Sequence, residues 1–587
     1  MKLADALITT LRDWNLHYLF GVSGANIEHL HDAVHRLGGE RLRSVCAKSE
    51  VGAAFMADCR ARVHRTLGVC CSTSGGGMMN LAVGVAEAFA ESVPLLAIVG
   101  QPPTWLEGRG AFQDSSGIGR SVNAARLWAA ISKYQERITE PSQFWRSLDC
   151  AVTAAMSGRP GPAVLLISRD LFDSDVGPRP AWMPDCLPEL NGLWHAPADA
   201  VAKLFDAICT AETPVLLLGS GVNRCSKPAA VVEFARRLGV RTATTLASKS
   251  AFPNNDPLYL GTVGVAGEPS AHRFLEEQAD LIVAVGSGLN VMTAQPIQQA
   301  LRPERLAVVN IDMGEVSRVI RSSLFIEADA GVVFSQLNQL ADQAHIVPRV
   351  TAPLPVTRFT PCLAPTMLPD KCNPPSIVRT GDLLQSQALE ILEPFLPRKG
   401  HVLFDAGNCA AAALHYLRIP ANVSATIALG MGGMGYAIAG AIGAQIGSLR
   451  GSRTMVFCGD GAFLMLGAEV HTAVDHQLPI LFVVFNNGMH GMCVTRQQLY
   501  FDGRIECSRY SPISVAKVAR GFGPSDRLWV GSASTIKELN EVLMDSPCWV
   551  DRPGVLELRL RREEMPPFTP FLPADAPTYI SAARHES

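Results

Sequence analysis

The sequence predicts an α/β protein built from parallel β-sheets that are covered by helices. Short apolar segments with the character of strands alternate with helical stretches, and this alternation is typical of parallel sheets. The chain has 587 residues, which is too long for one ordinary domain, and the alternation falls into three successive blocks. We therefore expect three α/β domains, each with its own parallel sheet.

The first block covers residues 1–180, and the second covers residues 197–347. Both contain runs of apolar residues that are long enough for a buried strand and are bounded by turn residues. In these two blocks, strands are expected within 66–74, 93–101, 158–171, 214–221, 280–288 and 306–312.

The third block covers residues 376–561 and follows a proline-rich linker at 348–375, whose composition resists regular structure. A tail at 562–587 with several prolines comes after it. The first and third blocks have a similar size and layout, as expected of two related domains that flank a third. Strands in the third block are expected within 401–408, 453–461 and 479–487.

The composition favours a protein with large buried cores over one that binds nucleic acid or a membrane surface. Hydrophobic residues make up 48% of the chain, and the formal net charge is only -3, with both signs spread along the sequence. The start has no signal-peptide pattern, and no run of 18 apolar residues occurs. The 15 cysteines show no repeating spacing, which is typical of reduced, buried thiols. We expect a cytoplasmic protein.

The third block carries the strongest chemical signal of the chain. One predicted strand ends in Gly459-Asp460-Gly461, and the next ends in Asn486-Asn487. The carboxyl ends of parallel strands meet at one edge of a sheet, and open α/β sheets bind ligands at that edge. We therefore expect these two motifs to lie close together.

This constellation fits a magnesium ion that holds a diphosphate. Mg²⁺ prefers six oxygen ligands, and proteins usually supply one or two carboxylates beside substrate phosphates. Asp460 supplies a charge, Asn487 an amide oxygen, and Met489 a backbone carbonyl. Gly461 and Ala462 are expected to open a helix whose N–H groups suit a phosphate.

A competing pattern lies slightly earlier in the chain. Gly430, Gly432 and Gly435 satisfy the G-x-G-x-x-G spacing of dinucleotide-binding loops. That spacing alone is a weak signal. The acid expected downstream would be Asp460, which sits inside Gly-Asp-Gly before another helix. The magnesium interpretation therefore explains more of the sequence than a nicotinamide nucleotide does.

The Gly-Asp-Gly and Asn-Asn pair resembles the signature of thiamine-diphosphate enzymes. The match to acetolactate synthases extends over residues 2–561, and segment 44–62 resembles the one that carries the activating glutamate, with Glu50 at that position. The resemblance implies a pyrimidine-binding, a middle and a diphosphate-binding domain. It also implies thiamine diphosphate and Mg²⁺ as cofactors.

The resemblance assigns specific roles to two residues. Glu50 would hold a proton at N1′ of the cofactor's pyrimidine, and the alternative is an ordinary acid in a helix first turn. Met434, within the matched segment 429–444, would support the bend of the cofactor, and the alternative is a core methionine. Phe112 and Gln113 would lie beside the substrate. Further cofactor contacts are implied for Gly24, Ala25, Asn80, Gly407, Asn408, Gly432, Gly459, Asp460, Gly461, Ala462, Asn487, His490, Gly491 and Met492.

The sequence also departs from the family pattern. Gly76 replaces a proline, and Ser49 stands where a histidine is common. Segment 286–292 lacks the arginine-and-acid run of the flavin-containing branch, so the sequence leaves FAD binding open. Arg496 replaces a tryptophan of the acceptor pocket, which makes Arg496 a candidate substrate residue.

We expect decarboxylation of a 2-oxo acid, with pyruvate as the expected donor, and carboligation of the acyl unit to a second carbonyl compound. The alternatives within the same chemistry are simple decarboxylation and cleavage of a C–C bond in a diketone. No adjacent histidine pair lies near the first-block motifs, which favours carboligation. A non-catalytic regulatory subunit is a remote alternative, because Glu50, Asp460 and Asn487 are all retained. The family resemblance implies a homodimer or homotetramer.

Overall fold

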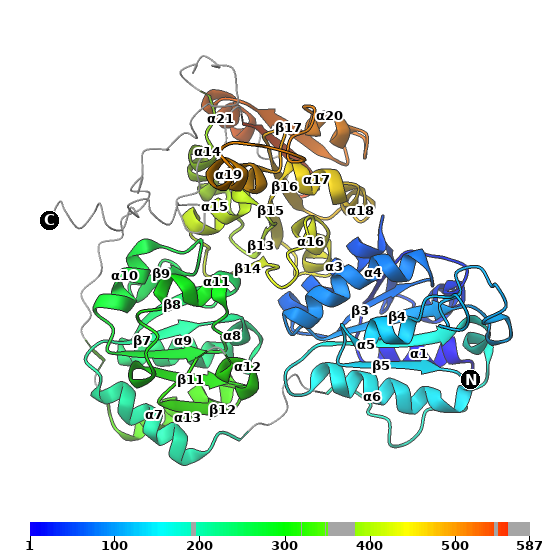
Figure 1. Cartoon of the computed structure of the whole chain (residues 1–587), viewed down its shortest axis with the longest axis horizontal. Helices are drawn as coiled ribbons and strands as arrows, with labels where there is room; N and C mark the ends of the chain where they lie inside the picture. The colour runs from blue at the N-terminus through cyan, green and yellow to red at the C-terminus, as the bar shows by residue number, and fades with distance from the viewer. Residues whose placement is uncertain (189–194, 319, 347, 350–381, 545–549, 561–587) are drawn as a thin grey trace. The chain divides into compact units, whose positions relative to one another are not determined.

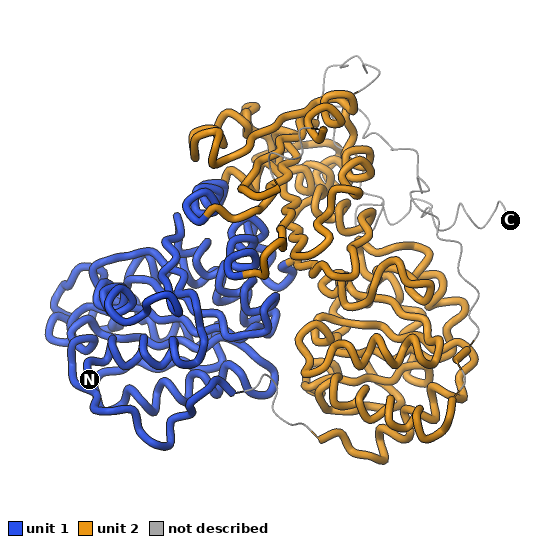
Figure 2. Tube along the Cα trace, turned by 180° about the vertical axis from the view of Figure 1, so that it is seen from behind, with its two compact units in different colours: residues 1–192, 428–447, 466–476 blue, residues 193–427, 448–465, 477–587 orange. Residues whose placement is uncertain are grey.

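The chain folds into two compact units, which Figure 2 shows in blue and orange. Unit 1 comprises residues 1–192, 428–447 and 466–476, and unit 2 comprises residues 193–427, 448–465 and 477–587. The computed structural model describes residues 1–188, 195–318, 320–346, 348–349, 382–544 and 550–560. The expected tail and nearly all of the expected linker lie outside these residues. The expected domain boundaries stay predictions.

Three six-stranded sheets, each parallel throughout, confirm the predicted fold class (Figure 1). The first sheet has the order β2 (Arg43–Cys46), β1 (Tyr18–Gly21), β3 (Gly68–Ser72), β4 (Leu95–Gln101), β6 (Pro162–Ser168), β5 (Tyr134–Ile138). The second has the order β12 (Leu324–Glu327), β11 (Leu306–Asn310), β10 (Leu281–Val285), β7 (Pro214–Leu218), β8 (Arg241–Thr245), β9 (Tyr259–Val263). The third has the order β14 (Val423–Ile427), β13 (Gly400–Phe404), β15 (Arg453–Gly459), β16 (Ile480–Asn486), β18 (Gly554–Arg559), β17 (Trp529–Ala533).

Helices connect these strands, as parallel pairing requires. The helices of unit 1 are α1 (Leu3–Asp13), α2 (Glu28–Leu37), α3 (Glu50–His64), α4 (Gly76–Ala90), α5 (Ala124–Ala129), α6 (Phe144–Met156), α16 (Tyr436–Gln445) and α18 (Glu469–Asp475). Those around the second sheet are α7 (Ala198–Thr210), α8 (Ser220–Arg224), α9 (Pro228–Leu238), α10 (Pro269–Glu277), α11 (Val291–Ala294), α12 (Met313–Ser317) and α13 (Ala330–Gln343). Those beside the third sheet are α14 (Gln385–Leu392), α15 (Asn408–Tyr416), α17 (Asp460–Leu466), α19 (Gly491–Tyr500), α20 (Val515–Arg520) and α21 (Ile536–Met544).

The first and third sheets share one strand order, which confirms the expected similarity of layout. In both, the second strand in sequence lies at one edge, followed by the first, third, fourth, sixth and fifth. The strand order therefore reverses between β1 and β3 and between β13 and β15. Ligands of open α/β sheets bind beyond the carboxyl ends of strands at such a reversal.

The second sheet is covered on both faces. Leu216 and Leu218 of β7 face the core made with α7, α9 and α13, while Val215 and Leu217 face the core made with α10. This alternation follows from the two-residue period of a strand. Read from β9, its order is third, second, first, fourth, fifth, sixth, which is the order of dinucleotide-binding sheets.

In unit 1, helix α3 packs closely against α4 and α16. A Cβ added at Gly84 of α4 would lie 2.4 Å from the Ala54 Cβ, and one added at Gly443 of α16 would lie 1.9 Å from the Met56 oxygen. Glycine at these two positions lets the helices approach. Within the described residues, no helix combines the length and apolar character needed to cross a bilayer.

Candidate functional site

Glu50 begins helix α3, and its carboxylate lies beside the first turn of α4. The side-chain amide of Asn80 donates a hydrogen bond to Glu50 Oε2 at 3.1 Å. A Cβ added at Gly77 would lie 2.8 Å from Glu50 Oε1, so glycine leaves this side of the carboxylate open. The structure thus brings together Glu50 and Asn80, two residues that the sequence singled out separately.

Two neighbouring residues fix the first turn of α3. Ser49, which replaces the family's common histidine, is the N-cap, and its hydroxyl accepts a hydrogen bond from the Gly52 N–H at 3.0 Å. Glu469 Oε1 accepts hydrogen bonds from the N–H groups of Lys48 at 3.0 Å and Ser49 at 3.1 Å. Burial raises the pKa of Glu469, and hydrogen bonds from Thr472 and these N–H groups oppose the rise.

Sequence reasoning missed Glu469, because nothing in segment 469–475 marks its first residue as a partner of α3. A Cβ added at Gly52 would lie only 2.1 Å from Glu469 Oε1. The small residues Gly52, Ala53 and Ala54 were the one available signal, because small side chains let another group approach a helix closely.

The loops after β1 and β3 meet at the reversal of the first sheet. A Cβ added at Gly24 would lie 2.8 Å from the Thr73 Cβ, so only glycine fits at this predicted site position. The Thr73 hydroxyl donates to Gln113 Oε1 at 3.3 Å, which places Gln113 at the same edge. Phe112 is 80% exposed, so the described structure does not bury it against this group.

The loop that carries Met434 also belongs to unit 1. A Cβ added at Gly433 would lie 2.8 Å from the Phe55 ring of α3, so the loop runs close to that helix. Gly432 and Gly435 have φ angles of +64° and +87°, in the region that favours glycine. The glycines of the G-x-G-x-x-G pattern therefore shape the start of α16.

Asp460 lies at the carboxyl end of β15 and opens helix α17, one residue earlier than expected. Its Oδ2 accepts a hydrogen bond from the Gly488 N–H at 2.8 Å, which joins the turns that follow β15 and β16. Asn487 Oδ1 accepts one from the Met489 N–H at 3.1 Å. The residues predicted to hold Mg²⁺ thus lie at one edge of adjacent strands.

The surroundings of Asp460 fit a cation. Burial raises the pKa of Asp460, while the hydrogen bond from the Gly488 N–H and the nearby Tyr510 hydroxyl oppose the rise. These donors are neutral, so a divalent ion would supply charge that they do not. Within the described ranges, no group of three His, Cys, Asp or Glu side chains is placed to hold a metal ion. A metal here would depend on one carboxylate and neutral oxygens, as Mg²⁺ sites commonly do.

Further predicted cofactor residues surround this edge. Gly407, with φ of +132°, precedes α15 after β13, and the Asn408 amide donates to the Thr495 hydroxyl of α19 at 3.1 Å. The His490 ring lies 5.4 Å from the Tyr510 ring, between centroids. Helix α19 begins at Gly491, directly after His490.

Arg496 lies on an exposed part of α19, and its guanidinium donates to Cys493 Sγ at 3.6 Å. It lies four positions after Met492, so the two lie on one side of the helix. Its place in an acceptor pocket stays a prediction. Of the predicted residues, Glu50, Asn80, Gly432 and Met434 belong to unit 1, whereas Asp460, Asn487, Met489 and Arg496 belong to unit 2.

Comparison with known proteins gives matches along most of the chain. Three family models match in order: the N-terminal TPP binding domain of thiamine pyrophosphate enzymes at residues 1–118, the central domain at 201–337 and the C-terminal TPP binding domain at 405–557. A probable acetolactate synthase large subunit of Methanocaldococcus jannaschii is 28% identical and covers 97% of this chain and 94% of its own. The acetolactate synthase isozyme 1 large subunit of Escherichia coli is 26% identical and covers 98% and 96%.

Gly76, the residue that replaces the family's proline, should accept proline. It is the first residue of α4, no atom lies within 4 Å of a Cβ added there, and its φ is not in the left-handed region. Proline suits a first helical position and restricts the unfolded chain, so Gly76→Pro should stabilise by roughly 0.4–1 kcal/mol. Calorimetric unfolding should show a higher midpoint. Gly75→Pro is the matched control and should destabilise, because Gly75 has φ of +65°. A lower midpoint for Gly76→Pro would contradict this account of the turn.

Proposed function

Because this chain belongs to the thiamine pyrophosphate enzymes and is acetolactate-synthase-like, we propose that it decarboxylates pyruvate and joins the acyl unit to a second 2-oxo acid. The observation that carries the proposal is the pairing of Glu50 with Asn80 in unit 1 and of Asp460 with the Asn487 turn in unit 2. Thiamine diphosphate, when bound, supplies a thiazolium carbon that attacks a 2-oxo group and stores the electron pair left by carbon dioxide.

In unit 1, Glu50 would hold a proton at the pyrimidine N1′. The Asn80 amide fixes one oxygen of the carboxylate, and the absence of a side chain at Gly77 leaves space beside the other. A carboxylate hydrogen bond to a protonated ring nitrogen is charge-assisted and therefore strong. Gln113, hydrogen-bonded to Thr73, would orient the substrate at the same edge, and Phe112 would close over it.

In unit 2, Asp460, Asn487 and the Met489 carbonyl would hold Mg²⁺, and Mg²⁺ would hold the diphosphate. Gly407 and Asn408 lie after β13, the strand next to β15, and would line the same edge. Arg496 would face the carboxylate of the acceptor, because its planar guanidinium suits a carboxylate better than the family's tryptophan does. The cysteines of the described residues form no disulfide with one another, which supports a place in the cytoplasm.

We propose that the reversal of the second sheet does not bind FAD. The Gly219 N–H donates to the Val285 oxygen at 2.8 Å, and the Gly221 N–H donates to the Gly286 oxygen at 2.9 Å. A Cβ added at Gly219 would lie 2.4 Å from the Gly286 oxygen, so the turns after β7 and β10 touch through their backbones. These N–H groups would otherwise receive a pyrophosphate. We therefore assign thiamine diphosphate and Mg²⁺, without FAD, to this chain.

Two copies of the chain would complete each site. Glu50 and Asp460 belong to different units. Helix α4 exposes Met79, Val83 and Phe89, and α17 exposes Leu464 and Met465. Apolar side chains exposed on the elements that carry site residues are typical of subunit contacts. These features support the proposal of a homodimer with shared sites, or of a homotetramer made from two such dimers.

Product analysis with the Glu50→Gln variant tests the activity. Incubation with thiamine diphosphate, Mg²⁺ and pyruvate should release carbon dioxide and form acetolactate, identified by mass spectrometry. Glu50→Gln should lower turnover by roughly 10²–10⁴-fold, because an amide stabilises a protonated pyrimidine poorly. Glu538→Gln is the matched control, since Glu538 is also a first-turn acid, in α21, and should leave the rate unchanged. Acetaldehyde as the main product would instead indicate simple decarboxylation.

The cofactor assignment predicts that the purified protein carries no flavin. Protein denatured in acid should release no compound with flavin absorbance, and added FAD should leave the unfolding midpoint unchanged. Thiamine diphosphate with Mg²⁺ should raise that midpoint, because a ligand that binds only the folded state stabilises it. One released FAD per chain would overturn the assignment.

A mixture of two inactive variants should regain activity. If each site takes Glu50 from one subunit and Asp460 from the other, a hybrid of Glu50→Gln and Asp460→Ala chains has one intact site. Random exchange makes half of the dimers hybrids, so roughly a quarter of all sites should work. Subunit exchange would be followed by mass spectrometry of intact dimers. Hybrids that form and stay inactive would show that each site lies within one chain.

A further inference from the structure

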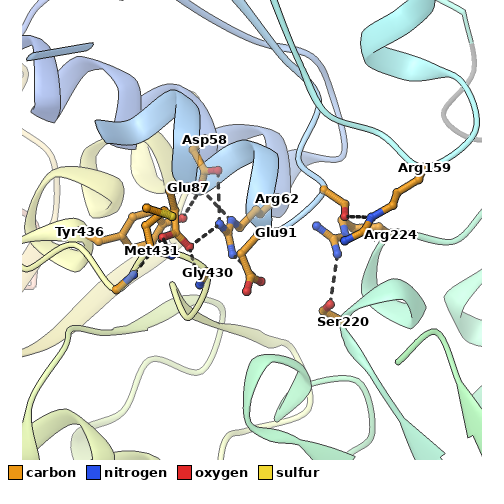
Figure 3. Close-up of polar contacts among 12 residues, drawn as sticks. Asp58, Arg62, Glu87, Glu91, Arg159, Ser220, Arg224, Gly430, Met431 and Tyr436 are labelled. Carbon is orange, nitrogen blue, oxygen red and sulfur yellow. Dashed lines mark hydrogen bonds and ion pairs between the residues drawn. The ribbon is translucent and has the colours of Figure 1, made fainter. Parts of the chain in front are cut away.

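A buried carboxylate on α4 holds the loop that carries Met434 (Figure 3). Glu87 is 1% exposed, and its Oε1 accepts a hydrogen bond from the Gly430 N–H at 3.1 Å. Its Oε2 accepts hydrogen bonds from the N–H groups of Met431 at 2.7 Å and Gly432 at 3.2 Å. Consecutive N–H groups that converge on one anion form a nest. Three charge-assisted hydrogen bonds therefore fix the backbone just before Met434.

A second anchor follows Met434. Tyr436, the first residue of α16, is buried, and its hydroxyl donates to Asp58 Oδ1 at 2.5 Å. The Arg62 guanidinium binds both oxygens of Asp58, at 2.7 and 3.3 Å, and lies 5.3 Å from the centre of the Tyr436 ring. Met434 thus stands between two points that are tied to α3 and α4.

Arg62 joins the two anchors electrostatically. Its guanidinium lies 3.4 Å from Glu87 Oε1 and 3.4 Å from Glu91 Oε2, in addition to its contact with Asp58 (Figure 3). One cation faces three carboxylates in a site that is nearly closed to water. The backbone N–H groups of the loop donate hydrogen bonds that stabilise the negative charge of Glu87. Burial of a charge without such compensation is costly. Docking of the loop and burial of Glu87 therefore depend on each other.

We propose that Glu87 is a positioning residue for the cofactor: by holding residues 430–432, its carboxylate fixes where Met434 supports the bend of thiamine diphosphate. The inference rests on the proposed function. Asn80, which binds Glu50, lies seven residues before Glu87 on the same side of α4. One helix thereby sets the position of the activating acid and of the residue beneath the bend.

Glu87→Gln tests the proposal, because an amide offers one acceptor oxygen and turns its NH₂ group toward an N–H donor. In the protein without cofactor, amide hydrogen exchange in peptides spanning 428–436 should become faster. The dissociation constant of thiamine diphosphate, measured by calorimetry at fixed Mg²⁺, should rise roughly 10- to 100-fold, as expected for the loss of hydrogen bonds to a charged group. At saturating cofactor, exchange of the thiazolium C2 proton, followed by NMR, should slow.

Asp329→Asn is the control for a merely structural effect. Asp329 is 1% exposed, caps α13 and accepts hydrogen bonds from Ser226 and the Val332 N–H in unit 2. This variant should lower the unfolding midpoint and leave amide exchange at 428–436, cofactor affinity and C2 proton exchange as in the wild type.

A second pair of variants approaches the same contact from the loop. Met431 is 61% exposed, so Met431→Ala should behave as the wild type, whereas Met431→Pro removes the N–H that donates to Glu87 and should weaken cofactor binding. Wild-type cofactor affinity and C2 proton exchange in both Glu87→Gln and Met431→Pro would overturn the proposal. If the wild type itself does not bind thiamine diphosphate, the proposed function fails instead.

Discussion

The parallel direction of the strands within every sheet is the constraint on which the candidate site depends. In a parallel sheet every strand ends at the same edge, and a helix returns the chain to the opposite edge. The turns after the strands and the starts of the helices therefore gather at one edge. At the reversal of the first sheet these turns carry Gly24 and Thr73, and at the reversal of the third they carry Gly407 and Asp460. Residues far apart in sequence thus meet at one edge of each sheet.

Buried carboxylates that accept backbone N–H groups set the fine geometry at these edges. Glu469 holds the residues before α3, Glu87 holds the loop before α16, and Asp460 holds the turn after β16. On folding, each carboxylate loses hydrogen bonds to water and gains hydrogen bonds from backbone N–H groups at fixed positions. This favours one backbone conformation over similar ones. Glycines complete this arrangement, because a side chain at Gly52 or Gly77 would collide with the carboxylate beside it.

The sequence predicted the parts that depend on local pattern. The strands before Asp460 and Asn487 form where the apolar runs placed them. The roles of Glu87 and Glu469 could not be predicted, because their partners lie 343 to 345 and 420 to 421 positions away in sequence. The backbone contact between the turns after β7 and β10 could not be predicted either. A glycine at 219 or 286 gives the same sequence pattern whether or not the two turns touch. The only sequence signal was that segment 286–292 lacks the arginine-and-acid run of the flavin-containing branch.

The shared strand order of the first and third sheets has an evolutionary consequence. Two six-stranded sheets with the same order of connections, in one chain, are the expected trace of a gene duplication. The two copies carry their candidate site acids at different places in this common order, Glu50 at a helix start and Asp460 at a strand end. Copies that differ in this way can contribute unlike groups to one site.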